Sequence, residues 1–286
     1  MNIRFENVWF AYENLGASAS QTHHQLQDIG FEVHDKDCIG IVGRSGSGKT
    51  TLMQLCNGLL APECGRVLVD EQDIHAPDYD LSALRRRIGL AFQFPETQIF
   101  ATTVFEEIAF GPRQQKLLPQ EVSQRVSEAL LRVGLDDAFA ARNPFTLSQG
   151  EKRRVALAGI FAMRPEVLIL DEPTASLDGR GIIEIRGLLH RWHAAGGTLL
   201  MISHDLDLIA GLCPRLLILE KGKLIYDGLI TSLWEGEARN STQKILQKAG
   251  LPLPRFERVR QHLASKGIPA GVISVLQEGR NEKTGP

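Results

Sequence analysis

The chain has 286 residues, of which 43% are apolar and 23% are charged, and its formal net charge is -2. A chain of this length can bury one large core or two modest ones, and the composition is that of an ordinary globular protein. The charge lacks the basic surplus that a nucleic-acid-binding protein normally carries, so we expect no nucleic-acid partner.

The first part of the chain is predicted to contain strands and one helix. Apolar and polar residues alternate over residues 1–12, which predicts an edge strand or a hairpin, and the polar stretch 13–25 predicts a loop. The apolar run 38–42 suits a buried strand. From Thr50 onward apolar residues recur at helical spacing, and the helix closes where glycine and proline appear between 58 and 65.

Further along, a helical middle section separates two groups of strands. Between about 95 and 163 the pattern is mainly helical. Helices are also expected at 181–195, near 242–249 and near 256–266, before a frayed end at 278–286. The remaining strands are predicted at 67–69, 88–92, 167–170 and 199–202. This alternation of strands and helices implies a parallel sheet covered on both faces.

The cysteines and the hydropathy pattern have plain structural interpretations. Cys38, Cys56, Cys64 and Cys213 form no Cys-x-x-Cys pair and no metal-ligand spacing, which is typical of reduced structural thiols. We find no pattern of a signal peptide and no stretch approaching the ~20 apolar residues of a spanning helix. The sequence therefore predicts a protein that does not cross a membrane but can lie against one.

The strongest motif is a phosphate-binding loop. The residues Gly43-Arg44-Ser45-Gly46-Ser47-Gly48-Lys49-Thr50 fit G-x-x-x-x-G-K-[ST] between a predicted strand and a predicted helix. Glycines let backbone N–H groups turn inward around phosphate oxygens, and the helix N-terminus adds partial positive charge. We expect the segment from Gly43 to Thr51 to bind ATP, with Lys49 at the β- and γ-phosphates and Thr50 at Mg²⁺.

A second motif places two acids at the end of a buried strand. In Leu168-Ile169-Leu170-Asp171-Glu172, the strand delivers Asp171 to the sheet edge at which α/β proteins bind ligands. We expect Asp171 to hold Mg²⁺, directly or through water. Glu172 is placed to polarise an attacking water. Alone, the motif is equally typical of an acidic turn.

A third motif, Leu147-Ser148-Gln149-Gly150-Glu151, resembles the LSGGQ signature of the ABC (ATP-binding cassette) ATPases. Gln149 stands in place of a glycine and Glu151 in place of a glutamine. The resemblance implies that Ser148 and Gly150, at a helix N-terminus, bind the γ-phosphate of ATP held by a second ATPase subunit. Gln149 and Glu151 belong to the same signature, which faces that ATP. The basic run that follows, 152–154, is typical of a solvated helical face.

Four more residues match positions of that family in chain order. The resemblance implies that Tyr12 stacks on adenine, that Gln93 contacts Mg²⁺ and the attacking water, and that Asp178 crosses the dimer interface. It implies that His204 contacts the γ-phosphate, so Glu172, His204 and Gln93 form the catalytic set. A histidine at a strand end is more often structural, and Tyr12 could instead be a core aromatic.

The resemblance also indicates the subtype. The run 92–100, Phe-Gln-Phe-Pro-Glu-Thr-Gln-Ile-Phe, is similar to one in ATPases of energy-coupling factor (ECF) importers, which take up vitamins, cobalt or nickel. Gln98 would then border the groove for a membrane partner. The implied partners are a second ATPase subunit, identical or paralogous, a membrane-embedded coupling (T) protein and a substrate-capture (S) protein. The chain would lie peripherally on the cytoplasmic face of the cell membrane.

The implied fold is α/β, a P-loop NTPase core with a mainly parallel sheet and an antiparallel N-terminal β subdomain. Residues 1–235 would form the nucleotide-binding domain, with a helical subdomain at about 95–163. Residues 236–286 would form a helical extension used in dimerisation. Two other functions stay open, an ATPase of another ABC transporter class and an ABC ATPase that serves no transporter. ATP and Mg²⁺ are the expected ligands.

Overall fold

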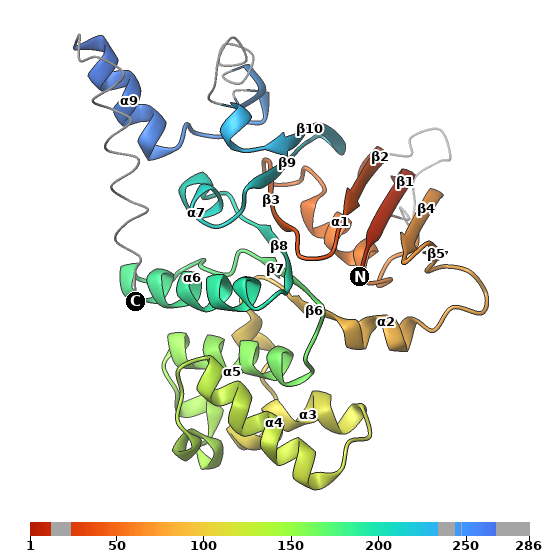
Figure 1. Ribbon diagram of the computed structural model, residues 1–286, viewed down its shortest axis with the longest axis vertical. Coiled ribbons are helices and arrows are strands. Elements are labelled where there is room, and N and C mark those ends of the chain that lie inside the picture. The colour runs from red at the N-terminus through yellow and green to blue at the C-terminus, as the bar shows by residue number, and fades with distance from the viewer. Residues whose placement is uncertain (13–23, 234–243, 247, 267–286) are drawn as a thin grey trace.

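The fold is built around one central sheet with an antiparallel sheet on one side of it and helices on the other (Figure 1). The computed structural model describes residues 1–12, 24–233, 244–246 and 248–266. The predicted loop lies outside these residues except for 24 and 25, and the predicted frayed end 278–286 lies outside them entirely. Residues 244–246 and 248 are helical, as predicted for 242–249.

The central sheet has six strands in the order β10-β9-β3-β8-β7-β6. All neighbours run parallel except β10, which pairs antiparallel with β9. The bounds are β3 Cys38–Val42, β6 Ile88–Ala91, β7 Val167–Asp171, β8 Thr198–Ile202, β9 Arg215–Glu220 and β10 Lys223–Leu229. The carboxyl ends of β3, β7 and β8 therefore meet at one edge, where ligands bind in sheets of this kind.

The second sheet is antiparallel, with the order β2-β1-β4-β5. Its strands are β1 Ile3–Phe10, β2 Leu26–Val33, β4 Cys64–Val69 and β5 Gln72–Asp73. The alternation over 1–12 does form a strand, but β1 is interior to its sheet, because β2 and β4 flank it. This agrees with the expected α/β core that carries an antiparallel N-terminal sheet.

The helices of the middle section gather below the central sheet in Figure 1. They are α3 Val104–Gln114, α4 Pro119–Arg132 and α5 Gln149–Ala162, with the short 3-10 turns η1 Pro95–Gln98, η2 Asp137–Ala141 and η3 Pro144–Thr146. The other helical elements are α1 Lys49–Cys56, α2 Leu81–Arg87, α6 Gly179–Ala194, α7 Leu206–Ala210, η4 Thr231–Leu233 and α9 Arg255–Ser265. Thr103 caps α3 by accepting the N–H of Glu106 at 3.2 Å.

The central sheet separates two hydrophobic cores. Along β7, Val167 and Ile169 pack with the antiparallel sheet and α1, whereas Leu168 and Leu170 pack with α5 and α6. This division follows from the period of two in a strand, which sends successive side chains to opposite faces. A strand buried on both faces is mostly apolar, which is why the sequence shows an uninterrupted apolar run from Val167 to Leu170, before Asp171 ends the strand.

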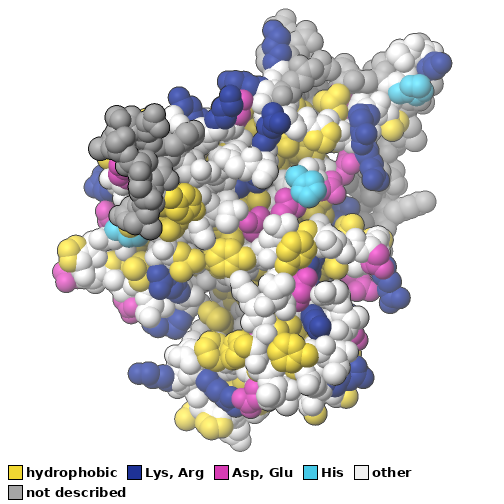
Figure 2. All heavy atoms as spheres, turned by 180° about the vertical axis from the view of Figure 1, so that it is seen from behind, with side chains coloured by type: hydrophobic (Ala, Val, Ile, Leu, Met, Phe, Trp, Pro, Cys, Tyr) yellow, Lys and Arg dark blue, Asp and Glu magenta, His cyan; other side chains and the backbone are white. Residues whose placement is uncertain are grey.

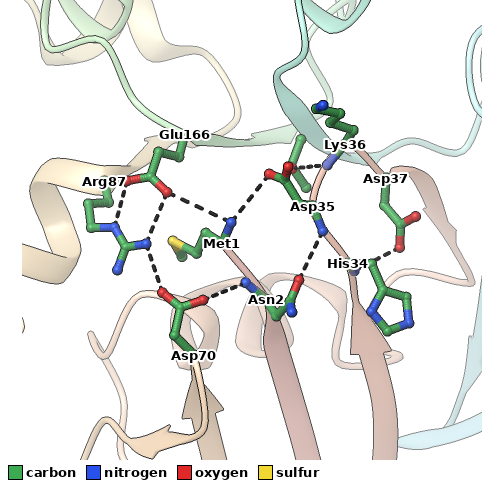
Figure 3. Close-up of polar contacts among 10 residues, drawn as sticks. Met1, Asn2, His34, Asp35, Lys36, Asp37, Asp70, Arg87 and Glu166 are labelled. Atoms are coloured by element: carbon green, nitrogen blue, oxygen red, sulfur yellow. Dashed lines mark hydrogen bonds and ion pairs between the residues drawn. The ribbon is translucent and has the colours of Figure 1, made fainter.

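An ion-pair network ties the antiparallel sheet to the start of β7 (Figure 3). The guanidinium of Arg87, at the end of α2, donates to both carboxylate oxygens of Glu166 at 2.7 and 2.9 Å and to Asp70 at 2.8 Å. Asp70 also accepts the backbone N–H of Asn2 at 2.9 Å. The Met1 ammonium lies 3.8 Å from Glu166. The network fixes how the two sheets meet.

Candidate functional site

The loop between β3 and α1 turns tightly around an open pocket of about 360 Å³. Gly48 has a φ of 103°, and a Cβ there would lie 2.9 Å from the carbonyl oxygen of Gln25. A Cβ on Gly43 would lie 2.2 Å from the carbonyl oxygen of Leu219. Both positions therefore require glycine. The loop leads into the N-terminus of α1, where backbone N–H groups are available to an anion.

Lys49 is the first residue of α1 and reaches back across the loop. Its Nζ donates to the carbonyl oxygens of Gly43 at 2.8 Å and Arg44 at 2.9 Å. Burial lowers the pKa of Lys49, while the nearby carboxylates of Asp171 and Glu172 act in the opposite direction. The ammonium is thus held where the loop, the helix and two acids converge.

Asp171 ends β7 and joins that strand to α1. The hydroxyl of Thr50 donates to Asp171 Oδ2 at 2.8 Å. Burial raises the pKa of Asp171, and the neighbouring Glu172 carboxylate raises it further, against the opposing effects of the Thr50 hydrogen bond and Lys49. A hydroxyl and a carboxylate side by side are oxygen ligands of the kind that Mg²⁺ prefers.

Glu172 follows directly in a strained backbone conformation, with a φ of 50°. Its Oε1 accepts the backbone N–H of His204 at 2.9 Å and lies 2.8 Å from His204 Nδ1. Its Oε2 accepts the Ser203 hydroxyl at 3.3 Å. The Glu172 side chain is largely buried, whereas the histidine ring is exposed. A carboxylate held in this way can accept a proton from a molecule in the pocket.

Most of the residues predicted to bind or process a nucleotide line this pocket together. The predicted residues among them are Gly43, Ser45, Gly46, Gly48, Lys49, Thr50, Thr51, Gln93, Asp171, Glu172 and His204. Gln25 also lines it and was not predicted. Its Nε2 donates to the carbonyl of Gly46 at 3.0 Å, and its polar surroundings in the sequence gave no signal of this contact.

Tyr12 lies beside α1 rather than among the lining residues. Its hydroxyl is 3.1 Å from Thr51 Oγ1, and its ring meets Phe10 edge to face at 4.9 Å. The side chain is half exposed, at 50%, whereas Phe10 is buried. Phe10 thus fills the core position, and Tyr12 keeps a ring face available for stacking.

Ser148 begins the helix α5 in a capping box. The hydroxyl of Ser148 accepts the N–H of Glu151 at 3.3 Å, and Glu151 Oε2 accepts the Ser148 N–H at 2.8 Å and its hydroxyl at 2.7 Å. The Ser148 hydroxyl and backbone hydrogen bonds lower the pKa of Glu151. Ser148, Gln149, Gly150 and Glu151 do not line the pocket. A Cβ on Gly150 would meet nothing within 4 Å, so this helix end presents an open surface.

The basic run 152–154 is not the solvated face that the sequence indicated. The side chain of Arg153 is only 2% exposed. Its guanidinium pairs with Glu96 of η1 at 2.8 and 3.0 Å and donates to the carbonyls of Pro173 and Ala175 at 3.2 and 2.6 Å. The interpretation of Arg153 as solvated was wrong because its partners lie far away in the sequence.

Two other predicted residues lie at element ends. Gln98 is exposed at the end of η1. Asp178 caps α6, where its carboxylate accepts the N–H of Gly181 at 2.7 Å. Phe100 and Phe110 are exposed near η1 and meet edge to face at 5.1 Å. On the face drawn in Figure 2, hydrophobic side chains are exposed over the lower, helical part of the molecule.

The pocket fits a nucleoside triphosphate and its metal. The Ser47 hydroxyl is buried in the loop between β3 and α1 and, among the described residues, has no hydrogen-bond partner. Its O–H is therefore a donor without an acceptor beside the pocket. The described residues contain no cluster of three or more His, Cys, Asp or Glu side chains able to hold a metal ion alone. Mg²⁺ commonly takes one or two protein ligands together with phosphate oxygens. Nor does any helix within the described residues have the length and apolarity to cross a membrane.

Comparison with known proteins gives consistent matches. A family model described as ABC transporter matches residues 26–175. The chain is 44% identical over 277 residues to a protein of Symbiobacterium thermophilum named energy-coupling factor transporter ATP-binding protein EcfA2, a match that covers 96% of this chain and 93% of that protein. It is 36% identical to a Streptococcus pyogenes protein of the same name, over 99% of this chain and 98% of that one.

Two solved structures are similar as well. Clostridium perfringens cbiO1, described as part of the ABC transporter complex cbiONQ, superposes with a TM-score of 0.72 at 32% identity, covering 87% of this chain and 97% of that one. The dimeric ATP-binding cassette MJ0796, bound to ADP and Pi, superposes with a TM-score of 0.70 at 27% identity, covering 80% and 98%.

Proposed function

The chain belongs to the ABC transporter family of ATP-binding proteins, and from that membership we propose that it is the ATP-hydrolysing motor subunit of an ECF-type importer. Such a motor would power the uptake of a vitamin or of a transition metal ion, cobalt or nickel, through membrane-embedded partners. The observation that carries the proposal is one pocket in which Lys49, Thr50, Asp171, Glu172 and His204 converge, in a chain similar over nearly its full length to ECF ATPases.

We propose that the phosphates of ATP bind at the loop and the N-terminus of α1. The backbone N–H groups and Lys49 would stabilise the charge that spreads over the γ-phosphoryl oxygens during transfer. Thr50 and Asp171 would hold Mg²⁺ with Gln93 close by, and the ion would neutralise phosphate charge. Tyr12 would stack on adenine. The pairing of Thr50 with Asp171 and the lining of the pocket support these assignments.

Glu172 is the proposed general base. It would orient a water beside the γ-phosphate and accept its proton, while the N–H and ring of His204 hold the carboxylate in one orientation. His204, being exposed at the rim of the pocket, is also available to the γ-phosphate. Because phosphoryl transfer depends on positioning and charge stabilisation, a displacement of either residue should slow hydrolysis steeply.

The pocket of one subunit would be completed by a second. We propose that Ser148, Gln149, Gly150 and Glu151 face the ATP of a second ATPase subunit, identical or paralogous, and that Asp178 lies at the same interface. The open surface at the N-terminus of α5 supports this arrangement. Residues 1–235 would form the nucleotide-binding domain, with its helical subdomain at about 95–163, and residues 236–286 would strengthen the dimer.

The membrane partner is proposed to dock near η1. Gln98 would border the groove for a coupling (T) protein, which in turn carries a substrate-capture (S) protein. The exposed aromatic pair Phe100 and Phe110 beside it supports an apolar contact. The chain would then lie peripherally on the cytoplasmic face of the membrane.

Co-purification tests this function. The tagged chain is expressed in its native host, membranes are solubilised in detergent, and the recovered complex is analysed by mass spectrometry. We expect a second ATPase subunit and multi-spanning membrane proteins in stoichiometric amounts. Recovery only from soluble fractions, with no membrane protein bound, would contradict the transporter assignment and favour an ABC ATPase that serves no transporter.

A further inference from the structure

Arg153 joins three segments that are far apart in the sequence. Its guanidinium forms two hydrogen bonds with Glu96 in η1 and two with the backbone between Glu172 and Asp178. Arg153 itself lies in α5, five residues after the helix cap Ser148. One side chain therefore holds together the proposed membrane-facing turn, the helix that begins at Ser148 and the segment that follows the proposed general base.

The pair is buried and geometrically specific. The Arg153 and Glu96 side chains are 2% and 8% exposed. Both carboxylate oxygens of Glu96 accept from different nitrogens of the guanidinium, at 2.8 and 3.0 Å, which is the bidentate arrangement. Replacing a buried ion pair by well-packed apolar residues often leaves the stability of a protein unchanged or raises it. A buried ion pair is therefore better explained by the single geometry that it specifies than by the stability that it adds.

The backbone that Arg153 contacts directly follows Glu172, the proposed general base. Its Nη1 donates to the carbonyls of Pro173 and Ala175, one and three residues after Glu172. The N–H of Ala175 in turn donates to the Glu172 carbonyl at 3.1 Å. The segment is bounded by positive φ angles, 50° at Glu172 and 61° at Ser176. A turn with so few alternative conformations moves as a unit and carries Glu172 with it.

Glu96, the partner of Arg153, belongs to the turn η1, where the membrane partner is proposed to dock. Glu96 lies between Gln93, which lines the pocket, and Gln98, which is exposed at the end of η1. Phe94 precedes it with a φ of 57°, and its ring lies under the guanidinium at 5.8 Å. The turn η1 is thereby attached to Arg153 by a charge pair and an aromatic contact.

We propose that Arg153 is a positioning residue, which through Glu96 transmits movement between η1 and the Glu172 segment and so makes hydrolysis depend on what docks at η1. This inference rests on the proposed function, because it assumes a partner at η1. Lysine cannot substitute, since a single ammonium cannot make the bidentate pair and both carbonyl contacts at once.

The first test needs no membrane partner. The full chain receives an environment-sensitive dye at Gln98→Cys, in a background in which the exposed Cys64 is changed to serine and the other three cysteines are buried. We expect MgATP to change the dye signal with a midpoint at the ATP dissociation constant. Arg153→Lys and Glu96→Gln should each reduce the amplitude about fivefold or more, because the effect of MgATP at the pocket then no longer reaches η1.

The matched control is the exposed pair on α3, Arg113→Lys and Glu106→Gln, which should leave the amplitude unchanged. Binding of a fluorescent ATP analogue is measured on every variant. We expect its dissociation constant to stay within about threefold, because neither Arg153 nor Glu96 lines the pocket. Glutamine has nearly the same shape as glutamate, so Glu96→Gln should fold. It therefore still tests the proposal if Arg153→Lys unfolds. The double variant should lose no more amplitude than either single one, as residues that act as one unit do.

The proposal is overturned if the parent shows no MgATP-dependent signal, or if the amplitude survives in both variants. It is also overturned if amplitude, ATP affinity and thermal stability all fall together, because that is the result of a purely structural role. A second experiment compares the ATPase rate of the membrane complex that contains the wild-type chain with the rates of the complexes that contain Arg153→Lys or Glu96→Gln. If wild-type chain recruits no membrane protein, the proposed function fails, whereas the dye experiment still decides the role of Arg153.

Discussion

Glu172 Oε1 lies 2.8 Å from His204 Nδ1 and accepts the backbone N–H of the same residue at 2.9 Å. One carboxylate oxygen is therefore held at two points by one neighbour. The geometry links the ends of β7 and β8, adjacent parallel strands, and it leaves the carboxylate fixed at the pocket rather than free to rotate.

Glu172→Gln should separate binding from hydrolysis. The amide keeps the shape of the side chain and an oxygen that can accept the His204 N–H, but it cannot take a proton from water. We expect ATP affinity close to wild type, a fall in ATP turnover of about a hundredfold or more, and a trapped ATP-bound dimer on size-exclusion chromatography. Glu184→Gln, a surface change on α6, is the control. Turnover near the wild-type rate would remove Glu172 from the catalytic role.

Asp171→Asn should stabilise the chain at neutral pH while it abolishes function. Burial raises the Asp171 pKa, so the folded state favours the protonated form and its ionisation at neutral pH weakens the fold. Asparagine has no charge and can still accept the Thr50 hydroxyl. We expect Tm to rise by a few degrees at pH 7.5, the shift that about 1 kcal/mol produces in a chain of this size.

That gain should shrink as the pH falls through the raised pKa, because wild-type Asp171 is then protonated in the folded state. Thermal melts at pH 7.5 and 5 measure it. Asp136→Asn, at an exposed position whose side chain makes no capping hydrogen bond, should change Tm little at either pH. A gain that grows on acidification would mean that the fold favours the ionised form of Asp171 after all.

Gly48→Ala and Gly46→Ala form a matched pair in the loop. Both glycines have positive φ, 103° and 76°, but a Cβ on Gly46 meets nothing within 4 Å, whereas one on Gly48 meets Leu26 at 2.5 Å and the Gln25 carbonyl at 2.9 Å. Gly46→Ala should cost about 1 kcal/mol in urea unfolding, and Gly48→Ala at least about 2 kcal/mol. Equal losses would mean that the loop can shift away from Gln25.

Arg87→Ala should weaken the junction of the two sheets without touching the pocket. The side chain is 36% exposed, so its three charge-assisted hydrogen bonds are partly screened, and we expect a loss of about 1–2 kcal/mol. Arg113→Ala, which removes a more exposed ion pair with Glu106, should cost less. ATP affinity should stay unchanged in both variants, and a large loss in Arg87→Ala would contradict a purely structural role.

The Arg87 effect should depend on pH. The Arg87 hydrogen bonds lower the pKa of Glu166 below its ordinary 4.5. A carboxylate with a lowered pKa stabilises the fold above its unfolded pKa, and that stability is lost as the pH falls through the folded pKa. The difference between wild type and Arg87→Ala should therefore be full at pH 7 and shrink below about pH 4.5, as measured by urea unfolding.

Glu151→Gln tests the unusual charge at the start of α5. Glutamine can also occupy this position of a capping box, so the helix should persist. If this helix end faces the phosphates of a neighbouring subunit's ATP, removal of the negative charge should tighten ATP-dependent dimerisation by up to about fivefold, the effect of ~1 kcal/mol between unit charges in water. Glu121→Gln in the first turn of α4 is the control. Weaker dimerisation would show that the carboxylate itself is needed.

The local parts of the site could be predicted from the sequence. Gly43 to Gly48 form the turn after β3, Lys49 and Thr50 begin α1, and each step follows from residue type and spacing. Glu172 and His204 come together because parallel strands end at a common edge, and the apolar runs before them located both strands. These elements could be located from the periodicity of their apolar residues, which a single sequence contains.

The missed parts depend on contacts between distant segments. Arg153 and Glu96 are 57 residues apart, and nothing beside Arg153 distinguishes it from the two basic residues that flank it. The strands β9 and β10 were not predicted, although the apolar run 216–219 and the glycine at 222 were usable signals. The interior position of β1 depends on β4, about 60 residues away, which periodicity cannot reveal.

The central sheet serves two cores with the same strands, and this has a consequence for how the molecule comes apart. Neither the helical layer nor the antiparallel sheet can detach without baring alternate residues of β7 and β8, such as Leu168 on one face and Ile169 on the other. Loss of either layer would therefore expose to water one face of the same strands on which the remaining layer packs. The two layers should melt in a single cooperative transition, as one thermodynamic unit despite their separate packing.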